Sequence, residues 1–215
     1  MQKIERIKCG NGNCYLIVNG ENAVLVDTSR FKHKDRIVEA CKKYNVRLIV
    51  LTHGHIDHVQ NAAYLSEKLG APIAMHRADI ELIKDNLVQE LQAKTWIGKG
   101  ILALSIKSFK EDPLPYFEPQ IFLEEGDSLI EYAVHASVIA LSGHTKGSIA
   151  LRVEDVSGIG QGLIVGDALM NMFSPTASLL YNEYNHMIKS VSRLNGFVDS
   201  TIFFGHGKPV RSHKI

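Results

Sequence analysis

Cysteine, proline and tryptophan are scarce in this chain of 215 residues, which contains three, six and one of them. The three cysteines form no Cys-x-x-Cys pair, and their odd number argues against a disulfide framework. A chain without disulfides is typical of a reducing compartment, so we expect a cytoplasmic protein. The first residues hold no apolar stretch of the secretory kind, and no window is apolar for the length of a membrane span.

An excess of one charge is lacking too, since 24 basic residues balance 23 acidic ones and the net charge is +1. Without an overall field we expect no nucleic acid and no membrane as partner, and a small-molecule substrate instead. The oligomeric state is not predicted. The apolar fraction of 45% and the length fit one ordinary globular domain, residues 1–215. Histidine, by contrast, is abundant, with ten residues.

Predicted strands and helices alternate along the chain. Apolar patterns and turn residues predict strands at 4–9, 14–19, 23–27, 47–51, 72–75, 121–123, 128–132, 134–140, 148–153, 163–165 and 201–204. Helical patterns cover 34–44, 58–69 and 183–194. Strands interrupted by helices predict sheets covered by helices, which is the α/β class. Periodicity alone leaves open whether there is one sheet or two.

The segment at about 77–120 fits this alternation poorly. Its first part, 79–98, has the pattern of an amphipathic helix, and 110–119 (KEDPLPYFEP) is too rich in proline to be regular. Such a segment is either a structural insertion or a lid that shapes a substrate pocket.

The histidines cluster directly after the strand predicted at 47–51. In THGHIDH, the side chains of His53, His55, Asp57 and His58 offer four potential metal ligands within six residues. In extended backbone His53 and His55 project to the same side, and a following helix turns Asp57 and His58 toward an adjacent point. A polar capping loop is the alternative, but the density of the cluster favours metal binding by one loop that supplies two ions.

Three more candidate ligands stand in similar settings. His144, Asp167 and His206 each follow an apolar strand-like run, and each comes directly after a glycine. One Gly-His or Gly-Asp pair alone would be explained by turn chemistry. Ligands in α/β sheets bind beyond the carboxyl ends of strands, so the repetition predicts that these three residues complete a binuclear site.

The motifs NCYLIV, AVLVDTS, THGHIDH, LSGHTKGS, VGDALM and FFGHG occur in this order over nearly the whole chain. Together they resemble the metallo-β-lactamase superfamily, and the glyoxalase II-like hydrolases in particular. The resemblance implies a four-layer αβ/βα sandwich of two mixed β-sheets flanked by helices. It also implies a ligand set: His53, His55 and His144 for one metal, Asp57, His58 and His206 for the other, and Asp167 bridging both.

The implied cofactors are two divalent ions, with zinc expected first and iron or manganese as alternatives because of the carboxylate ligands. Two ions about 3.5–4 Å apart can share a hydroxide near neutral pH, and this hydroxide would attack an ester-like carbonyl. Asp57 is a candidate proton shuttle. Asp27 in AVLVDTS is expected either to orient a ligand histidine or to serve as a turn residue or helix cap. The hydroxyl of Thr145, after His144, is expected to do similar orienting work.

Thioester hydrolysis of the glyoxalase II type fits the ligand set best. The chain ends nine residues after His206, however, so the C-terminal helical domain that grips glutathione in full-length glyoxalase II is expected to be missing. A lactonase of the acyl-homoserine lactonase type is the alternative, with Tyr181 and Tyr184 as candidate substrate contacts. A β-lactamase, a nuclease, a sulfur dioxygenase and a non-catalytic metal-binding protein fit less well. The remaining histidines, His33, His76, His135, His186 and His213, are expected to have structural or surface roles.

Overall fold

The computed structural model describes residues 1–212, so His213 lies outside the described residues. Its strands are β1 (Lys3–Cys9), β2 (Gly12–Asn19), β3 (Asn22–Val26), β4 (Asn45–Val50), β5 (Ile73–Met75), β6 (Ile121–Phe122), β7 (Ala136–Ala140), β8 (Ile149–Val156), β9 (Gly160–Ile164), β10 (Leu169–Met170), β11 (Thr176–Ala177), β12 (Ser200–Phe203) and β13 (Val210–Arg211). Its α-helices are α1 (Lys34–Cys41), α2 (Ile56–Val59), α3 (Ala62–Leu69), α4 (Trp96–Glu111) and α5 (Tyr184–Arg193). Within residues 1–212 no helix combines the length and the hydropathy that a bilayer crossing requires.

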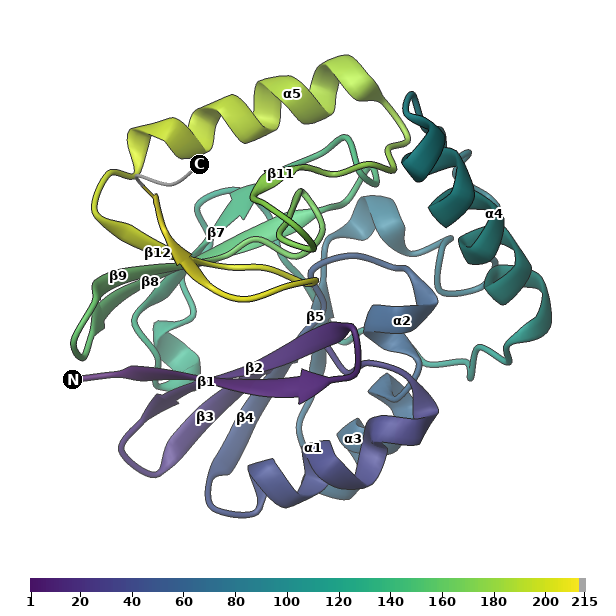
Figure 1. Cartoon of the computed structure of the whole chain (residues 1–215). Helices are drawn as coiled ribbons and strands as arrows, with labels where there is room; N and C mark the ends of the chain where they lie inside the picture. Colours follow the sequence, from purple (N-terminus) through teal and green to yellow (C-terminus); the bar gives the residue numbers. More distant parts are fainter. Residues whose placement is uncertain (213–215) are drawn as a thin grey trace.

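Two mixed sheets form the centre of the molecule (Figure 1). The first has the order β1-β2-β3-β4-β5-β6; its first two pairings are antiparallel and the other three are parallel. The second has the order β13-β12-β9-β8-β7, in which only the pairing of β9 with β12 is parallel. The question that periodicity left open is therefore answered in favour of two sheets.

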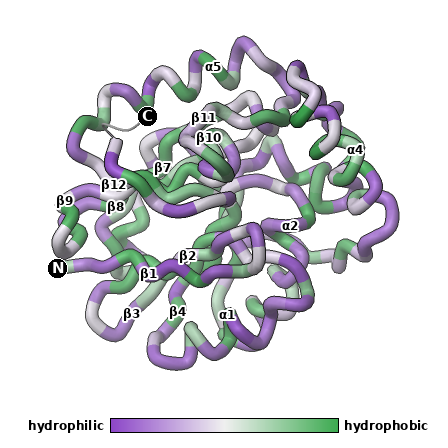
Figure 2. Tube along the Cα trace, in the orientation of Figure 1, coloured by the Kyte–Doolittle hydropathy of each residue, from purple (hydrophilic) through white to green (hydrophobic). Residues whose placement is uncertain are grey.

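Alternation along the strands separates the layers. In β2, Leu16 and Val18 pack in a cluster that contains Ile37 of α1 and Leu65 of α3. Their neighbours Tyr15 and Ile17 point the other way and pack against residues of the second sheet. A third apolar cluster lies between the second sheet and the end of α5. Figure 2 shows the hydrophobic segments concentrated in the middle of the molecule, on the strands. The order helices, sheet, sheet, helix confirms the predicted four-layer sandwich.

The helix predicted at 79–98 is wrong, because α4 begins only at Trp96. From Arg77 to Thr95 the chain forms a 3₁₀ turn and further turns, in which the buried side chains of Asp79, Asn86 and Gln89 hydrogen-bond to neighbouring loops. A continuous helix would carry these polar groups away from their partners. Thr95 starts α4 instead, since its side chain accepts a hydrogen bond from the Gly98 amide. The irregular course predicted for the proline-rich stretch is confirmed from Asp112 onward.

Two further elements differ from the prediction. The segment 128–132 is a 3₁₀ turn at Ile130–Tyr132 rather than a strand, and it ends in Ala133 with φ 65°. The helix expected at 58–69 is divided into α2 and α3. At the break the Asn61 side chain donates hydrogen bonds to the carbonyls of Thr28, Ser29 and Arg30, which ties the loop after β3 to this point. Strands β10, β11 and β13 have two residues each, too few to produce a pattern.

Candidate metal centre

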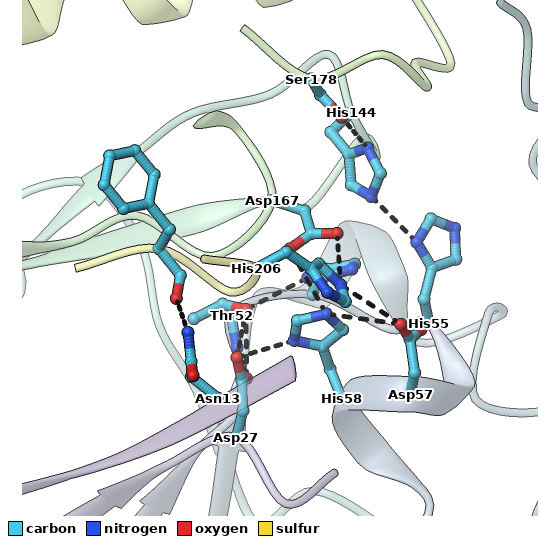
Figure 3. Close-up of polar contacts among 12 residues, drawn as sticks. Asn13, Asp27, Thr52, His55, Asp57, His58, His144, Asp167, Ser178 and His206 are labelled. Atoms are coloured by element: carbon cyan, nitrogen blue, oxygen red, sulfur yellow. Dashed lines mark hydrogen bonds and ion pairs between the residues drawn. The ribbon is translucent and has the colours of Figure 1, made fainter. Parts of the chain in front are cut away.

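The seven predicted ligands lie together at one edge of the two sheets (Figure 3). His53 and His55 come from the loop after β4, and Asp57 and His58 from α2. The second sheet supplies the other three from the loops after β7, β9 and β12: His144, Asp167 and His206. Each half of the chain thus contributes ligands from loops that follow its strands.

Three histidines form the first group. The ligand atoms of His53, His55 and His144 all lie within 4.8 Å of one another, and all three side chains are buried. Nδ1 of His55 lies 3.0 Å from Nε2 of His144. The three rings stand nearly perpendicular to one another, with centroids 4.8–4.9 Å apart. Three imidazole edges therefore converge on one point, which is a donor set that zinc prefers.

The second group joins carboxylates to imidazoles. Nε2 of His206 lies 3.4 Å from Oδ2 of Asp57 and 3.3 Å from Oδ2 of Asp167. The other carboxylate oxygen of Asp167 lies 3.4 Å from Nε2 of His58. Asp167 also forms a group of potential ligands with His53 and His58, so its carboxylate lies between the two sets of histidines.

The unpaired atoms test whether a metal fits. Within residues 1–212, three buried polar atoms that face other predicted ligands make no hydrogen bond: Nε2 of His53, Nε2 of His58 and Oδ1 of Asp167. Each such orphan costs about 1–3 kcal/mol unless a ligand satisfies it. Atoms bound tetrahedrally at about 2.1 Å from one ion lie roughly 3.4 Å apart, which is the spacing of Asp167 from His58 and His206. The residues present therefore fit a divalent metal ion.

A buried network fixes the orientation of two of the predicted ligand histidines. Oδ2 of Asp27 lies 2.8 Å from Nδ1 of His58, an arrangement in which the ring donates and Nε2 keeps its lone pair. The Thr52 hydroxyl donates to the same carboxylate and lies 3.1 Å from Nδ1 of His53. Asp27 thus orients His58 directly and His53 through Thr52. Asp27 therefore makes the contact expected of an orienting residue, and metal binding by His58 stays a prediction.

Backbone carbonyls orient two others. Nδ1 of His144 lies 2.8 Å from the carbonyl of Leu180, and Nδ1 of His206 lies 3.1 Å from the carbonyl of Asn11. Because a carbonyl only accepts, each ring donates through Nδ1 and presents Nε2 to the centre. Ser178 adds a hydroxyl 3.1 Å from Nδ1 of His144.

The two groups also differ electrostatically. Burial lowers the pKa of His53, His55 and His144, in the case of His55 to about 3, so these imidazoles are neutral and free to act as ligands. Burial would also lower the pKa of His206, but the charges of Asp167 and Asp57 outweigh it and raise that pKa to about 10. The carboxylates therefore make the second group a site for positive charge.

The glycines before His144, Asp167 and His206 have separate structural reasons. Gly143 has φ 133°, and a Cβ there would lie 2.2 Å from the Met187 amide nitrogen. Gly166 has φ 53° and packs on Thr52. At Gly205 a Cβ would lie 2.2 Å from Oδ1 of Asp167. Gly205 thus leaves room for the side chain of the predicted ligand Asp167.

Sequence reasoning missed Asp79, which it placed in a helix. This fully buried carboxylate accepts hydrogen bonds from the Gly54 amide, the Gly147 amide and the Thr145 hydroxyl, at 3.0, 2.7 and 2.6 Å. It thereby joins the loop of His53 and His55 to the loop of His144. Thr145 was expected to orient a histidine, but its hydroxyl donates to Asp79 instead. No local pattern marks Asp79, because its partners are distant in sequence.

The other residues singled out from the sequence lie in ordinary structural settings. His76 caps a 3₁₀ turn, where its Nδ1 accepts from the Ala78 amide. The rings of Tyr181 and Tyr184 contact each other edge to face at 5.1 Å, and Tyr181 is buried. His135, expected in a strand, is exposed and lies directly before β7.

Comparison with known proteins agrees with this fold. An uncharacterized protein of Mycobacterium tuberculosis (strain ATCC 25618 / H37Rv) is 27% identical over 208 residues, covering 91% of this chain and 85% of its own. The hydroxyacylglutathione hydrolase GloC of Haemophilus influenzae is 26% identical over 200 residues, with 91% and 85% covered.

Solved structures are similar over most of their length. A crystal structure of TTHA1623 in a di-iron-bound form has a TM-score of 0.67 and 24% identity, covering 95% of this chain and 92% of the other. The BLEG-1 B3 metallo-beta-lactamase has a TM-score of 0.71 and 18% identity, covering 96% and 93%. The model of the metallo-beta-lactamase superfamily matches residues 7–206. This chain belongs to the metallo-beta-lactamase superfamily.

Proposed function

We propose that the protein is a hydrolase that uses two divalent metal ions to cleave a thioester. The observation that carries the proposal is the position of the Asp167 carboxylate. One of its oxygens lies 3.3 Å from Nε2 of His206 in the second group, and its ligand atom lies within 4.8 Å of that of His53 in the first group. One oxygen of this carboxylate makes no hydrogen bond within the described part of the chain. A carboxylate between two groups of imidazoles is the arrangement that a bridge between two ions requires.

In this proposal His53, His55 and His144 hold one ion, Asp57, His58 and His206 hold the other, and Asp167 contacts both. Zinc suits the three imidazoles. The oxygen ligands on the other side also suit iron or manganese, and the similar TTHA1623 was solved with two irons. When bound, such a pair of ions lowers the pKa of water toward 7 and polarises a carbonyl.

Side chains of the protein then move protons and control access to the metal centre. The oxygen of water bonds to the acyl carbon and gives up a proton, the carbon–sulfur bond breaks, and the sulfur takes up a proton and leaves as a thiol. Asp57 is placed to move that proton, because its side chain is 28% exposed and lines a cavity of about 290 Å³. Burial would raise the pKa of Asp57, but the hydrogen bond from His206 and the charges of His58 and His206 together outweigh it and lower that pKa, so the carboxylate is deprotonated near neutral pH.

The segment 77–120 is proposed to form a wall of the pocket. Phe109 of α4 stacks on the ring of His55, with centroids 5.2 Å apart and planes 21° apart. An aromatic ring against a ligand histidine excludes water from that side of the centre, which strengthens electrostatic interactions there. The same contact joins α4 to the proposed first ion.

The choice of a thioester is supported by the similar Haemophilus hydrolase, whose name gives a hydroxyacylglutathione as its substrate. The test is to determine metal content per chain by mass spectrometry and to assay thioesters, lactones, β-lactams and phosphodiesters. We expect two ions per chain and turnover of thioesters that chelation abolishes. A fully loaded protein that hydrolyses none of the thioesters would refute the proposal.

The bridging role is tested separately by Asp167→Ala. We expect this variant to lose both metal occupancy and activity, because the carboxylate serves two ions. Asp35→Ala, at an exposed position on α1, is the matched control and keeps both. Full occupancy by two ions in Asp167→Ala would contradict the bridge.

A further inference from the structure

Two cavities meet at the turn between β1 and β2. The first, of about 290 Å³, is lined by the proposed ligands Asp57 and His206. The second, of about 510 Å³, is lined by Lys8 and Lys208 among others. Both include Gly10 and Asn11 in their walls, so the two cavities adjoin at this turn, the first beside the proposed metal centre and the second beyond it. Cavities of this size are typical of small-molecule sites. We call the two adjoining cavities together the turn groove.

The turn groove is strongly cationic. Its cationic side chains are Arg6, Lys8, Arg30, Lys32 and Lys208, while burial lowers the pKa of His33 and favours its neutral form. The one carboxylate among its lining residues is Asp57, a proposed metal ligand. The whole chain carries a net charge of only +1, so this concentration of basic groups is local and not the result of a general excess. A cleft lined by charges of one sign raises the local concentration of the opposite ion.

Three of these cations are free to meet a ligand. Lys8, Lys32 and Lys208 are exposed, and none forms an ion pair with any residue between 1 and 212. Arg30 differs, since its guanidinium is paired with Asp112 at 2.6 Å. Of these three lysines, Lys32 lines the cavity that holds Asp57 and His206, and Lys8 and Lys208 line the other.

Hydrogen bonds hold the two walls of the turn groove together. The Asn13 side chain donates to the carbonyls of Phe204 and Gly207, at 2.9 and 2.8 Å, and so joins the β1–β2 hairpin to the loop that carries Lys208. Nε of Arg6 donates to the same Asn13 at 2.7 Å. Arg6 and Lys8 are two residues apart on β1 and project to one side of the strand. The hairpin tip lies beside the loop of His206 in Figure 1.

We propose that the turn groove binds the anionic carrier end of the substrate, a phosphate or carboxylate group on the thiol that leaves. This inference rests on the proposed function, because it assigns the thiol half of the thioester to the groove and the acyl carbon to the metal centre. At the outer end of the groove Met172 and Phe173 are exposed, Phe173 by 88%, and offer an apolar surface beyond the charges.

The test compares one acyl group on three thiols: coenzyme A, which carries phosphates; glutathione, which carries carboxylates; and N-acetylcysteamine, which is neutral. For the wild type we expect a lower KM for the thioester of at least one anionic thiol than for that of N-acetylcysteamine, and we expect this KM to rise with salt. In the double variant Lys8→Gln/Lys208→Gln the KM for the anionic thioester should rise about tenfold. Its kcat should stay the same, and so should both constants for the neutral thioester. Lys189→Gln on α5 is the control.

Direct binding keeps the two proposals separable. Calorimetric titration with free coenzyme A, with glutathione and with a single-stranded oligonucleotide should give binding of a thiol carrier that the double variant weakens. If thioesters are hydrolysed but the double variant changes neither KM nor binding, the groove proposal is wrong and the hydrolase stands. If no thioester is hydrolysed but carrier binding is weakened, the hydrolase is wrong and the groove stands. Binding of the oligonucleotide alone overturns the carrier proposal.

Discussion

Nδ1 of His58 lies 2.8 Å from Oδ2 of Asp27, and both side chains are at most 3% exposed. Asp27 has φ 60°, a conformation that asparagine and aspartate tolerate better than other side chains. Asp27→Asn therefore keeps the backbone and removes the charge that orients His58. We expect metal affinity to fall about 10–100-fold, measured by competition with a chelating dye.

The control for that variant is Asp199→Asn, because Asp199 has nearly the same backbone conformation, φ 59°, and is exposed. It should bind metal as the wild type does. Unchanged affinity in Asp27→Asn would mean that the position of His58 does not depend on the carboxylate.

Asp79 should matter for stability as well as for the metal centre. Asp79→Ala leaves the buried amides of Gly54 and Gly147 and the Thr145 hydroxyl without their acceptor. Each unsatisfied group costs about 1–3 kcal/mol, so the free energy of unfolding should drop by about 3 kcal/mol or more. Urea denaturation of the chelated protein measures this. Asp35→Ala should change it by less than about 0.5 kcal/mol, and an equally small change in Asp79→Ala would contradict the prediction.

Gly205→Ala should reduce metal binding while the fold is retained. The added methyl group would lie 2.2 Å from Oδ1 of Asp167 and 2.9 Å from Cε1 of His58. Rotation of the Asp167 carboxylate is the smallest movement that relieves the contact, so we expect lost metal occupancy with little loss of secondary structure. Elemental analysis and circular dichroism check the two expectations.

A matched change is available at Gly100 in α4, where a Cβ would meet nothing within 4 Å. Gly100→Ala should retain both ions and stabilise the helix by about 0.5–1 kcal/mol. Two retained ions in Gly205→Ala would show that Asp167 does not need the space beside that glycine.

The metal-free protein should lose stability in mild acid. Burial holds the pKa of His53, His55 and His144 below that of an unfolded imidazole, which is about 6.5. Below pH 6.5 the unfolded chain therefore binds protons that the folded chain refuses, and stability falls as pH falls, until about 3 for His55. The melting temperature of the chelated protein should decrease from pH 7 to pH 5.

His206 does not cancel this effect. Its pKa is raised to about 10, so its contribution to stability is complete below 6.5 and is lost only as pH rises toward 10. A melting temperature that is constant between pH 7 and pH 5 would show that the three buried histidines are already charged in the folded protein.

The sequence predicts the candidate metal ligands better than the residues that hold their loops in place. His53 and His55 are two residues apart in extended backbone, so their convergence follows from local geometry. His144 and His206 could be placed because each follows a strand. Asp79 could not, since its three partners belong to loops 25 to 68 positions away. The same buried contacts explain why the helical pattern at 79–98 misled.

The hydrogen bond from Asn13 to the carbonyl of Phe204 joins positions 191 apart. During synthesis the hairpin that carries Asn13 is therefore made 191 positions before this partner. His206 lies two residues beyond Phe204. In the proposed centre the second ion thus needs a polypeptide that extends at least to His206, since a shorter one contains the His53 loop but lacks a ligand of that ion.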